Sequence, residues 1–231
     1  MNKKENIILG VIGVIALTIF TSICIVIALN RLPQIDVAVR DFAYQIRGEK
    51  FGFGYWFFRI ITEFGYIYIM GIVIIALALY TRMDNRFWVF LFVLLLSRVF
   101  NTVFKEIYER ARPLEEMRWQ VETSTSFPSG HSTNVGVIFA YLAYIFYKSD
   151  SKVSIKATGM TLSIIIIPLV MFSRNILGVH YFTDVCAGAS CGIMCAVIGM
   201  LLVNLFNYKN IMTKPLIFKN YKKKEEAVEA E

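Results

Sequence analysis

Long runs of apolar residues, separated by short polar segments, recur along this chain. Six of them approach the roughly 20 residues that an α-helix needs to cross a lipid bilayer. The runs cover approximately residues 7–29, 64–81, 87–104, 133–147, 157–172 and 185–207. The first is longer than the apolar core of a signal peptide and lacks a small-x-small cleavage site, which favours a retained helix. The pattern predicts an all-α integral membrane protein, a six-transmembrane-helix bundle with both termini on one side.

The segment between the first two runs, residues 30–63, is polar overall but patterned. Ile35, Val39, Phe42 and Ile46 recur in it at helical spacing. This spacing predicts an interfacial amphipathic helix that lies among the lipid headgroups between spans 1 and 2. Two glycines then end the helix, and an aromatic-rich stretch follows over residues 53–58. That stretch either anchors the chain at the membrane surface or forms a wall of a lipid entry groove.

Composition supports the membrane assignment, and the distribution of charge orients the chain. The sequence is 57% hydrophobic and 18% charged, whereas a soluble domain averages about 25% charged residues. Lysine and arginine dominate the termini and the loops near residues 82–86 and 148–156. On the opposite side, basic residues are offset by an equal number of acidic ones. Because cytoplasmic loops are enriched in basic residues, both termini are expected in the cytoplasm, with the opposite end facing outward from the plasma membrane.

The net charge of +7 is best explained by retention in the membrane and contact with anionic headgroups, so no nucleic-acid partner is expected. No internal repeat or second soluble domain is evident, which predicts a single membrane domain over residues 1–231. Its charged tail, about 209–231, is expected to be disordered. The four cysteines fall within predicted spans and are interpreted as packing residues, not as disulfide or metal ligands. The sequence leaves the oligomeric state open.

The chain has only two histidines, and both stand in polar motifs between apolar runs. His131 follows Pro-Ser-Gly, and His180 stands four residues before Asp184. On a helix that spacing lets the carboxylate reach the imidazole, which would fix its tautomer and leave Nε2 free. Imidazole can both transfer protons near neutral pH and attack phosphorus. Each motif alone also has a structural explanation as a helix cap.

Groups suited to binding an anion accompany the histidines. Lys105 and Arg112 are seven residues apart, so they can project from one face at the end of the third apolar run. Ser129 and Gly130 can offer backbone N–H groups at a helix N-terminus, which is a ready anion site. Arg174 adds a planar guanidinium that matches phosphate oxygens. The combination predicts phosphoryl chemistry at a membrane boundary.

Taken in order, these segments resemble the three signatures of the type 2 phosphatidic acid phosphatase superfamily. The signatures are Lys-x6-Arg-Pro, Pro-Ser-Gly-His and Ser-Arg-x5-His-x3-Asp. All three occur between Lys105 and Asp184 without a departure at a signature position. The six predicted spans are similar to the layout of that family, in particular of its bacterial membrane lipid phosphatases. The resemblance therefore implies a membrane enzyme that acts on a lipid phosphate.

The resemblance also implies a role for each matching residue. His180 would be the nucleophile that forms a phosphohistidine, and Asp184 would orient it. His131 would protonate the leaving oxygen and then deprotonate the attacking water. The groups expected to hold the phosphoryl oxygens are Lys105, Arg112, Ser129, Gly130 and Arg174. The family needs no metal, so neither a metal nor another cofactor is expected.

The identity of the substrate and the final acceptor stay open. Undecaprenyl diphosphate and phosphatidylglycerol phosphate are favoured over phosphatidic acid, because the site is expected to face outward. A phosphotransferase that passes the phosphoryl group to an alcohol would use the same residues. A small transporter is a weaker alternative, because it would not need two histidines in separate phosphate-binding motifs. A vanadium-dependent haloperoxidase of the wider superfamily is disfavoured by the predicted spans.

Arg98 is a further charged residue, and it lies deep in the third apolar run. It stands seven residues before Lys105, on the same helical face. An ionisable residue within a membrane span usually has a partner or a function. Two interpretations follow: an ion pair, with Glu63 or Asp184 as the partner, or a contact with the substrate.

Overall fold

The computed structural model describes residues 3–29 and 32–208, and every regular element within these ranges is a helix. The elements are α1 (Lys3–Ala28), α2 (Gln34–Ile46), α3 (Phe53–Thr62), the 3₁₀ turn η1 (Glu63–Gly65), α4 (Ile67–Thr81), α5 (Asn85–Tyr108), the 3₁₀ turn η2 (Glu115–Met117), α6 (Gly130–Lys148), α7 (Val153–Ile176) and α8 (Phe182–Tyr208). The all-α prediction is confirmed. The predicted tail, residues 209–231, lies outside the described residues.

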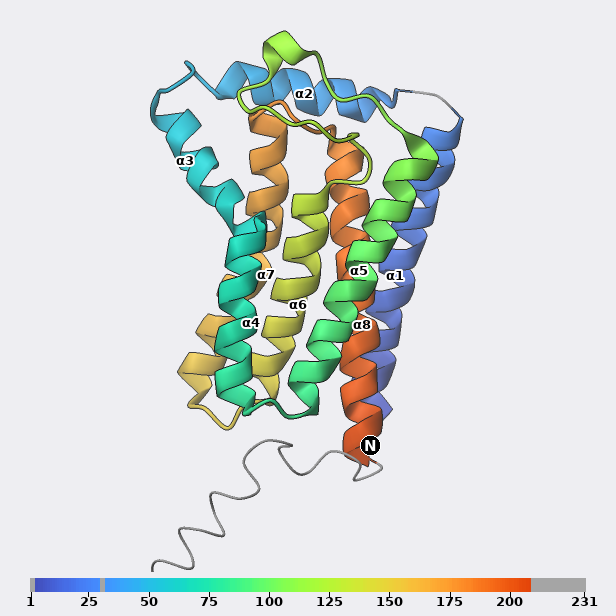
Figure 1. The fold of residues 1–231 in the computed structure, drawn as a ribbon, viewed down its shortest axis with the longest axis vertical. Helices are drawn as coiled ribbons and strands as arrows, with labels where there is room; N and C mark the ends of the chain where they lie inside the picture. The colour runs from blue at the N-terminus through green and yellow to red at the C-terminus, as the bar shows by residue number, and fades with distance from the viewer. Residues whose placement is uncertain (1–2, 30–31, 209–231) are drawn as a thin grey trace, which may run out of the picture.

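The long helices form a bundle, and the short helix α2 lies across one end of it. Figure 1 shows α1, α4, α5, α6, α7 and α8 running along the long axis, with α3 slanting from the α2 end towards α4. The start of α1 and the described end of α8 both lie at the end opposite α2 (Figure 1). The loop between α5 and α6 runs beside α2, over the ends of α6, α7 and α8.

Not every long helix is apolar enough to count as a membrane span. By length and composition, α1, α5, α7 and α8 qualify, and α3 with α4 makes a fifth candidate if this pair, bent by 51°, is one broken span. The helix α6 is not among them, because its first turns carry the polar sequence Gly-His-Ser-Thr-Asn. A membrane protein with four to five apolar spans is thus supported, whereas the predicted count of six is not confirmed.

Two helices are longer than their apolar runs suggested, for local reasons. The side chain of Asp84 caps the start of α5 by accepting a hydrogen bond of 2.8 Å from the backbone N–H of Arg86. The apolar run predicted at 157–172 contains Pro168, and α7 continues through this proline. Membrane helices tolerate proline because neighbouring helices and polar side chains can satisfy the freed backbone groups.

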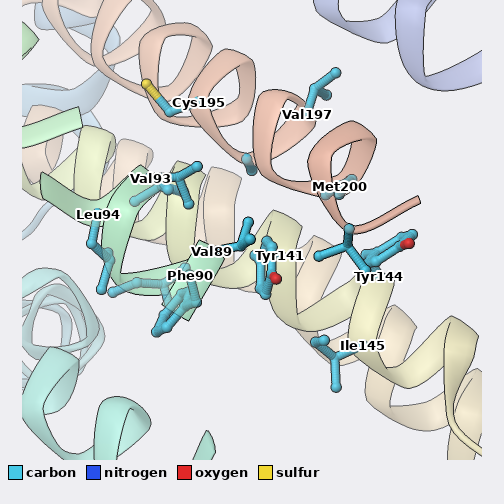
Figure 2. Close-up of a cluster of buried hydrophobic side chains, with 14 of the residues drawn as sticks. Val89, Phe90, Val93, Leu94, Tyr141, Tyr144, Ile145, Cys195, Val197 and Met200 are labelled. Atoms are coloured by element: carbon cyan, nitrogen blue, oxygen red, sulfur yellow. The ribbon is translucent and has the colours of Figure 1, made fainter. Parts of the chain in front are cut away.

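Side chains from α5, α6 and α8 pack into a buried apolar cluster, shown in Figure 2. Phe90 and Val93 of α5 and Tyr141 of α6 are fully buried in it, next to Cys195 of α8. The four cysteines, all free, lie within helices, in agreement with the packing role predicted for them. On the outside of the bundle, large apolar side chains are exposed on α1, α4, α5 and α7. A continuous exposed apolar surface of this kind suits contact with lipid.

Glycines bring α6 and α8 into backbone contact. A Cβ atom added at Gly136 would lie 2.7 Å from the carbonyl oxygen of Ala189. One added at Gly188 or Gly192 would overlap the carbonyl oxygen of Ser129 or Thr133, respectively. Only glycine permits so close an approach. This glycine contact fixes the start of α6 relative to the start of α8.

Candidate active site

The residues singled out in the sequence gather at the end of the bundle near α2. They come from the first turns of α6 and α8, from the C-terminal ends of α5 and α7, and from the α5–α6 loop. A cavity of about 540 Å³ reaches this point, and His131, His180, Lys105 and Arg112 line it. From there the cavity extends between α4 and α5 along apolar side chains. The predicted convergence of the three motifs is therefore seen in the structure.

His180 lies just before α8, and its two ring nitrogens have different surroundings. Nη1 of Arg112 stands 3.1 Å from Nε2. Because a guanidinium can only donate, Nε2 must be the unprotonated nitrogen. At the other nitrogen, Nδ1 lies 3.3 Å from Oγ of Ser126, whose own proton goes to Asp184. The ring therefore carries its proton on Nδ1 and presents a lone pair at Nε2.

The carboxylate of Asp184 is fully buried and lies behind Ser126, on the Nδ1 side of the His180 ring. It accepts hydrogen bonds from Oγ of Ser126 at 2.5 Å and from the backbone N–H of Tyr181 at 2.9 Å. Its Oδ2 stands 3.7 Å from Nδ1 of His180, which is too far for a direct hydrogen bond. The predicted contact between carboxylate and imidazole is instead bridged by Ser126. The reason is that α8 begins only at Phe182, so His180 lacks the helical geometry on which that prediction depended.

His131 occupies the first turn of α6 and faces the break between α3 and α4. A Cβ atom on Gly65 would come within 2.7 Å of the His131 ring, and the ring of Tyr66 packs edge-on with the centroids 4.5 Å apart. Within the described residues, Nε2 of His131 is buried and has no hydrogen-bond partner. A buried polar atom without a partner is costly, so this nitrogen is suited to a group that enters the cavity.

The cations Lys105 and Arg112 border the cavity and are fixed by backbone carbonyl groups. Nζ of Lys105 donates to the carbonyl of Thr125 at 2.5 Å. Arg112 donates to the carbonyl groups of Ser124 and Val179, at 2.6 and 2.8 Å. These bonds to neutral carbonyl groups hold both cations near His180, and the carboxylate of Glu122 lies 3.6 Å from Arg112. Both cations border the cavity, so they can contact an anion inside it.

Arg174 is fully buried beside the cavity, and a carboxylate covers it. Its guanidinium donates to Oγ1 of Thr62 at 2.8 Å and forms a short ion pair with Glu122. The other carboxylate oxygen of Glu122 lies 3.6 Å from Arg112. Nε of Arg174 has no partner among the described residues. Glu122, which lines the cavity, thus occupies the position between the two arginines where phosphoryl oxygens were predicted.

The backbone N–H groups of Ser129 and Gly130, both predicted to bind phosphoryl oxygens, differ in whether they already have an acceptor. The N–H of Ser129 already donates to the carbonyl of Asp184 at 3.1 Å, and its side chain caps α6 by accepting from the N–H of Ser132. Gly130 is the first residue of α6 and lines the cavity. Its N–H, like every N–H of a first helical turn, has no acceptor in its own helix. A contact between Ser129 and a phosphoryl group therefore stays a prediction.

Four residues that the sequence did not single out belong to the same network: Ser126, Glu122, Arg110 and Asp36. Arg110 bridges the carboxylates of Asp184 and Asp36, at 2.5 and 2.8 Å. A signal existed for two of the four: Arg110 lies inside the Lys-x6-Arg-Pro segment and Ser126 lies next to the Pro-Ser-Gly-His segment. Asp36 and Glu122 stand apart from any motif, and only the fold brings them to the site.

The electrostatics of the site favour a neutral imidazole. Burial lowers the pKa of His180 well below its ordinary value of about 6.5, and the charges of Arg112 and Arg174 act in the same direction. Burial also lowers the pKa of Arg112 to about 10, which leaves its guanidinium charged at neutral pH. Over residues 3–29 and 32–208, no three His, Cys, Asp or Glu side chains are grouped so that they could hold a metal ion. The charged side chains that line the cavity are the cations Arg98, Lys105 and Arg112 and the carboxylate of Glu122.

The structure is thus a bundle of apolar helices with two histidines and several cationic side chains gathered at one end. Comparison with known proteins agrees with this class: the model of the PAP2 superfamily matches residues 86–208, just over half of the chain. The chain belongs to the PAP2 superfamily.

Individual relatives are similar over different lengths. Phosphatidylglycerophosphatase B of Bacillus subtilis (strain 168) is 41% identical over 100 residues, which are 42% of this chain and 48% of that protein. The match thus spans about half the length of this curated relative. The crystal structure of a transmembrane PAP2-type phosphatidylglycerolphosphate phosphatase from Bacillus subtilis is similar with a TM-score of 0.68 and 28% identity, over 84% of this chain and 96% of that one. Aquifex aeolicus LpxE shares the fold, with a TM-score of 0.51 and 23% identity over 76% of this chain and 91% of that one.

Proposed function

We propose that this chain is a membrane lipid phosphatase that hydrolyses a phosphate ester or diphosphate through a phosphohistidine formed on His180. The observation that carries the proposal is the contact of Arg112 with Nε2 of His180, which leaves a lone pair at this nitrogen, in a cavity that Lys105 and His131 also line. Membership of the PAP2 superfamily supports phosphoryl chemistry. The names of the Bacillus subtilis relatives point to a phosphatidylglycerophosphate-like substrate.

In the first step, Nε2 of His180 attacks the phosphorus atom. A new N–P bond forms while the bond from phosphorus to the leaving oxygen breaks. His131 gives its proton to that oxygen, so that the lipid alcohol or the shortened lipid phosphate departs in its protonated form. A dianionic phosphoryl group beside His131 favours the protonated imidazole that this step requires. The unpartnered Nε2 of His131 supports this assignment.

In the second step, water attacks the phosphohistidine. His131 accepts a proton from the water, a new P–O bond forms, and the N–P bond returns its electron pair to Nε2 of His180. Inorganic phosphate leaves, and the site is restored. Asp184, acting through Ser126, holds Nδ1–H throughout, so the ring keeps the tautomer that exposes Nε2.

Negative charge on the phosphoryl oxygens is met by Lys105, Arg112 and the N–H of Gly130 at the start of α6. Arg174 joins them once the substrate displaces Glu122, and Ser129 joins once its N–H exchanges its bond to Asp184. These groups supply the positive charge that a metal ion provides in other phosphoryl-transfer enzymes, so we propose that the reaction needs no metal.

The part of the cavity between α4 and α5 suits the hydrocarbon part of a lipid. Its walls include Ile67, Met70 and Ile74 of α4 and Leu91 and Leu95 of α5. An opening on this side lets a lipid reach the histidines while its chains stay among apolar side chains. This groove supports a lipid, as opposed to a soluble phosphate, as the substrate.

Arg98 points to a substrate with two phosphorus-bearing groups. It lines the same cavity two helical turns below Lys105 and makes no hydrogen bond or ion pair with any residue in the ranges 3–29 and 32–208. Its expected partners are engaged elsewhere, Glu63 with Arg59 and Asp184 with Arg110. A second phosphate, as in phosphatidylglycerol phosphate or undecaprenyl diphosphate, would supply the missing counter-charge. Phosphatidic acid has none to offer.

For the membrane arrangement we propose six spans, with α2 in the headgroup layer and the site at the outer face of the plasma membrane. Both described ends of the chain lie at the end of the bundle opposite the site (Figure 1), which requires an even number of crossings. On α2, Ile35, Phe42 and Ile46 are about half exposed, as expected of an apolar stripe that meets lipid. The distribution of lysine and arginine orients the termini to the cytoplasm.

The decisive test is phosphate release by the purified protein from a panel of lipids in vesicles. Release from phosphatidylglycerol phosphate or undecaprenyl diphosphate should exceed release from phosphatidic acid, survive excess EDTA and be blocked by vanadate. In Arg98→Gln, the ratio between phosphate release from these two lipids and release from phosphatidic acid should fall by about tenfold, the typical effect of losing a hydrogen bond to a charge. Loss of activity with EDTA that Mg²⁺ restores would refute the metal-free mechanism. Transfer to an added alcohol in place of water would identify a phosphotransferase.

Orientation can be tested separately by labelling introduced cysteines in intact cells. Glu116→Cys, in the exposed turn η2, should react with an impermeant thiol reagent. Arg82→Cys, exposed at the other end of the bundle, should react only after permeabilisation. The unmodified protein gives the background of the four native cysteines. The reverse pattern would place the site in the cytoplasm.

A further inference from the structure

A buried carboxylate on α2 is built into the start of α8. Asp36 is fully buried. It accepts hydrogen bonds from the backbone N–H of Thr183 at 2.8 Å, from Oγ1 of the same residue at 2.7 Å and from Nη2 of Arg110 at 2.8 Å. A buried charge is tolerated only when it is paired and hydrogen-bonded in this way. Asp36 therefore fixes α2 to the first turn of the helix that carries Asp184.

Arg110 connects this carboxylate to the site. Its Nη1 donates to Oδ1 of Asp184 at 2.5 Å and to Oγ1 of Thr183 at 2.8 Å, while Nη2 faces Asp36. The guanidinium carbon also lies 4.4 Å from the centre of the Tyr181 ring. Because the guanidinium is planar and rigid, fixing one of its nitrogens on Asp36 sets where the other can hold Asp184.

The arrangement also shares one positive charge between two carboxylates. Asp36 and Asp184 are both fully buried, and Arg110 is the cation that contacts both. Were Asp36 neutral, Arg110 would pair with Asp184 alone and offset more of its charge. Asp184 would then polarise Ser126 and the Nδ1–H of His180 less strongly. Asp36 thus controls the orientation of Asp184 and also its effective charge.

The opposite face of α2 is apolar and open. Ile35, Phe42 and Ile46 are exposed by 49–53%, and α2 lies across the end of the bundle (Figure 1). One helix therefore carries an apolar stripe on one side and the anchor of the catalytic network on the other. Any displacement of α2 would move Asp36 and, through Arg110, Asp184.

We propose that Asp36 is a positioning residue for the reaction: through Arg110 it sets the orientation and charge of Asp184, so that turnover depends on the docking of α2 onto α8. This inference rests on the proposed phosphohistidine mechanism. It assigns to α2 a role beyond attachment to the membrane surface, because the seating of this helix becomes a condition for an active nucleophile.

The test compares Asp36→Asn with Asp41→Asn on the same helix. Asp41 is exposed and, among the residues that the structure describes, pairs only with Arg40, so its loss should leave turnover unchanged. Asp36→Asn should lower kcat on vesicle substrate by about 10- to 100-fold, the usual effect of losing a partner behind a catalytic group, with KM little changed. If wild-type protein releases no phosphate, the proposed function fails. If wild-type protein is active and Asp36→Asn matches it, only the role of Asp36 fails.

A pH profile separates positioning from general damage. Removing the negative charge of Asp36 should move the acid limb of kcat/KM to lower pH, because His180 then holds its proton less well. Asp41→Asn should leave the limb in place, and an unshifted limb in Asp36→Asn would contradict the proposal. The titratable and charged groups around His180 that also set this limb are Lys105 on α5, Arg112 and Glu122 in the α5–α6 loop, His131 on α6, Arg174 on α7 and Asp184 on α8.

A double-mutant cycle identifies the route of the effect. If Asp36 acts through Asp184, Asp36→Asn combined with Asp184→Asn should be no slower than Asp184→Asn alone. Independent, additive losses would overturn the proposal. Thermal unfolding of each purified variant is measured in parallel. If Asp36→Asn does not fold, Arg110→Lys replaces it, since lysine keeps the charge but cannot bridge two carboxylates. Full kcat in this variant would refute the proposed link.

Discussion

The two sides of the bundle differ in how closely their helices approach. Between α6 and α8, Gly136, Gly188 and Gly192 bring backbone against backbone, and a single added methyl group would not fit. Between α4 and α5 lies a cavity of about 540 Å³. Elsewhere on α4, a Cβ atom on Gly71, which is not a cavity-lining residue, would meet nothing within 4 Å. The tight side carries His131 and Asp184 on its helix ends. In the proposed reaction, the tight side would hold the catalytic groups in place, and the cavity on the open side would admit the lipid.

The largest expected effect comes from replacing the two histidines at the end of the bundle where α6 and α8 are in close contact. His180→Ala should abolish turnover on every substrate, because no nucleophile remains. His131→Ala should lose about 10²- to 10⁴-fold on lipid, the typical contribution of a general acid. It should recover partly on an aryl phosphate, whose leaving group needs little protonation. Phosphate release and trapping of an acid-labile phosphoenzyme measure both effects. A phosphoenzyme that forms in His180→Ala would overturn the assignment.

The glycine contact itself can be broken by one methyl group. Gly192→Ala places Cβ onto the carbonyl of Thr133 and against Val137, so the helices must separate. We expect a loss of about 1–3 kcal/mol in the free energy of unfolding, as for other overpacked sites, together with lower activity. The matched change on the open side, Gly71→Ala, should stabilise by up to about 1 kcal/mol through helix propensity. Thermal unfolding midpoints of the two variants moving in the same direction would contradict this comparison.

A larger side chain in the α4–α5 cavity should raise the KM for lipid and leave the chemical steps unchanged. Met70→Trp places a large ring in the α4–α5 groove, because Met70 lines the cavity. The expected result is a KM for long-chain lipid raised by about tenfold, since lost apolar burial of even 50 Å² amounts to more than 1 kcal/mol. Hydrolysis of a soluble aryl phosphate should not change. Ile72→Trp is the control, because Ile72 is exposed on α4 and lies outside the cavity lining. An equal rise of KM in both variants would argue against entry through this groove.

The smallest expected effect concerns the pH at which kcat/KM begins to fall on the acid side. Burial lowers the pKa of His180, with Arg112 and Arg174 adding to the shift, so the imidazole loses its proton at lower pH than a free histidine does. The neutral nucleophile is then present throughout the range above about pH 6.5. The kcat/KM of the wild-type protein, measured between acidic and neutral pH, should fall only below that value. An inflection above it would mean that the site stabilises the imidazolium instead.

Much of the site could be predicted from sequence because its groups stand in short motifs at helix ends. Lys105 and Arg112 share one segment, and Ser129 to His131 open a helix whose polar first turns are visible as a pattern. The spacing of His180 and Asp184 brings Nδ1 and Oδ2 to 3.7 Å, but it does not reveal that α8 begins after His180 and that no direct hydrogen bond forms. Ser126 fills the resulting gap, and its role depends on how the α5–α6 loop folds back.

The fold was predictable to the extent that it depends on apolar runs. The helices themselves follow from those runs, and α2 was placed from its apolar stripe. The burial of Asp36 was not predictable, because the same residue reads as part of a solvated polar face until α2 is docked on α8. The glycine contact was equally hidden, since a glycine in an apolar run gives no indication of which helix it will meet.

One feature of the resting site bears on what happens after each turnover. The carboxylate of Glu122 contacts Arg174 and lies 3.6 Å from Arg112, so the anion position is occupied by the protein itself. In the proposed reaction, a phosphate group would bind there by displacing this carboxylate, so its net gain in free energy would be the difference between two ionic contacts. Released phosphate would then compete with a carboxylate that belongs to the same chain and is present at high local concentration. This competition would favour release of the product, whereas a lipid would also be held by its chains in the α4–α5 groove.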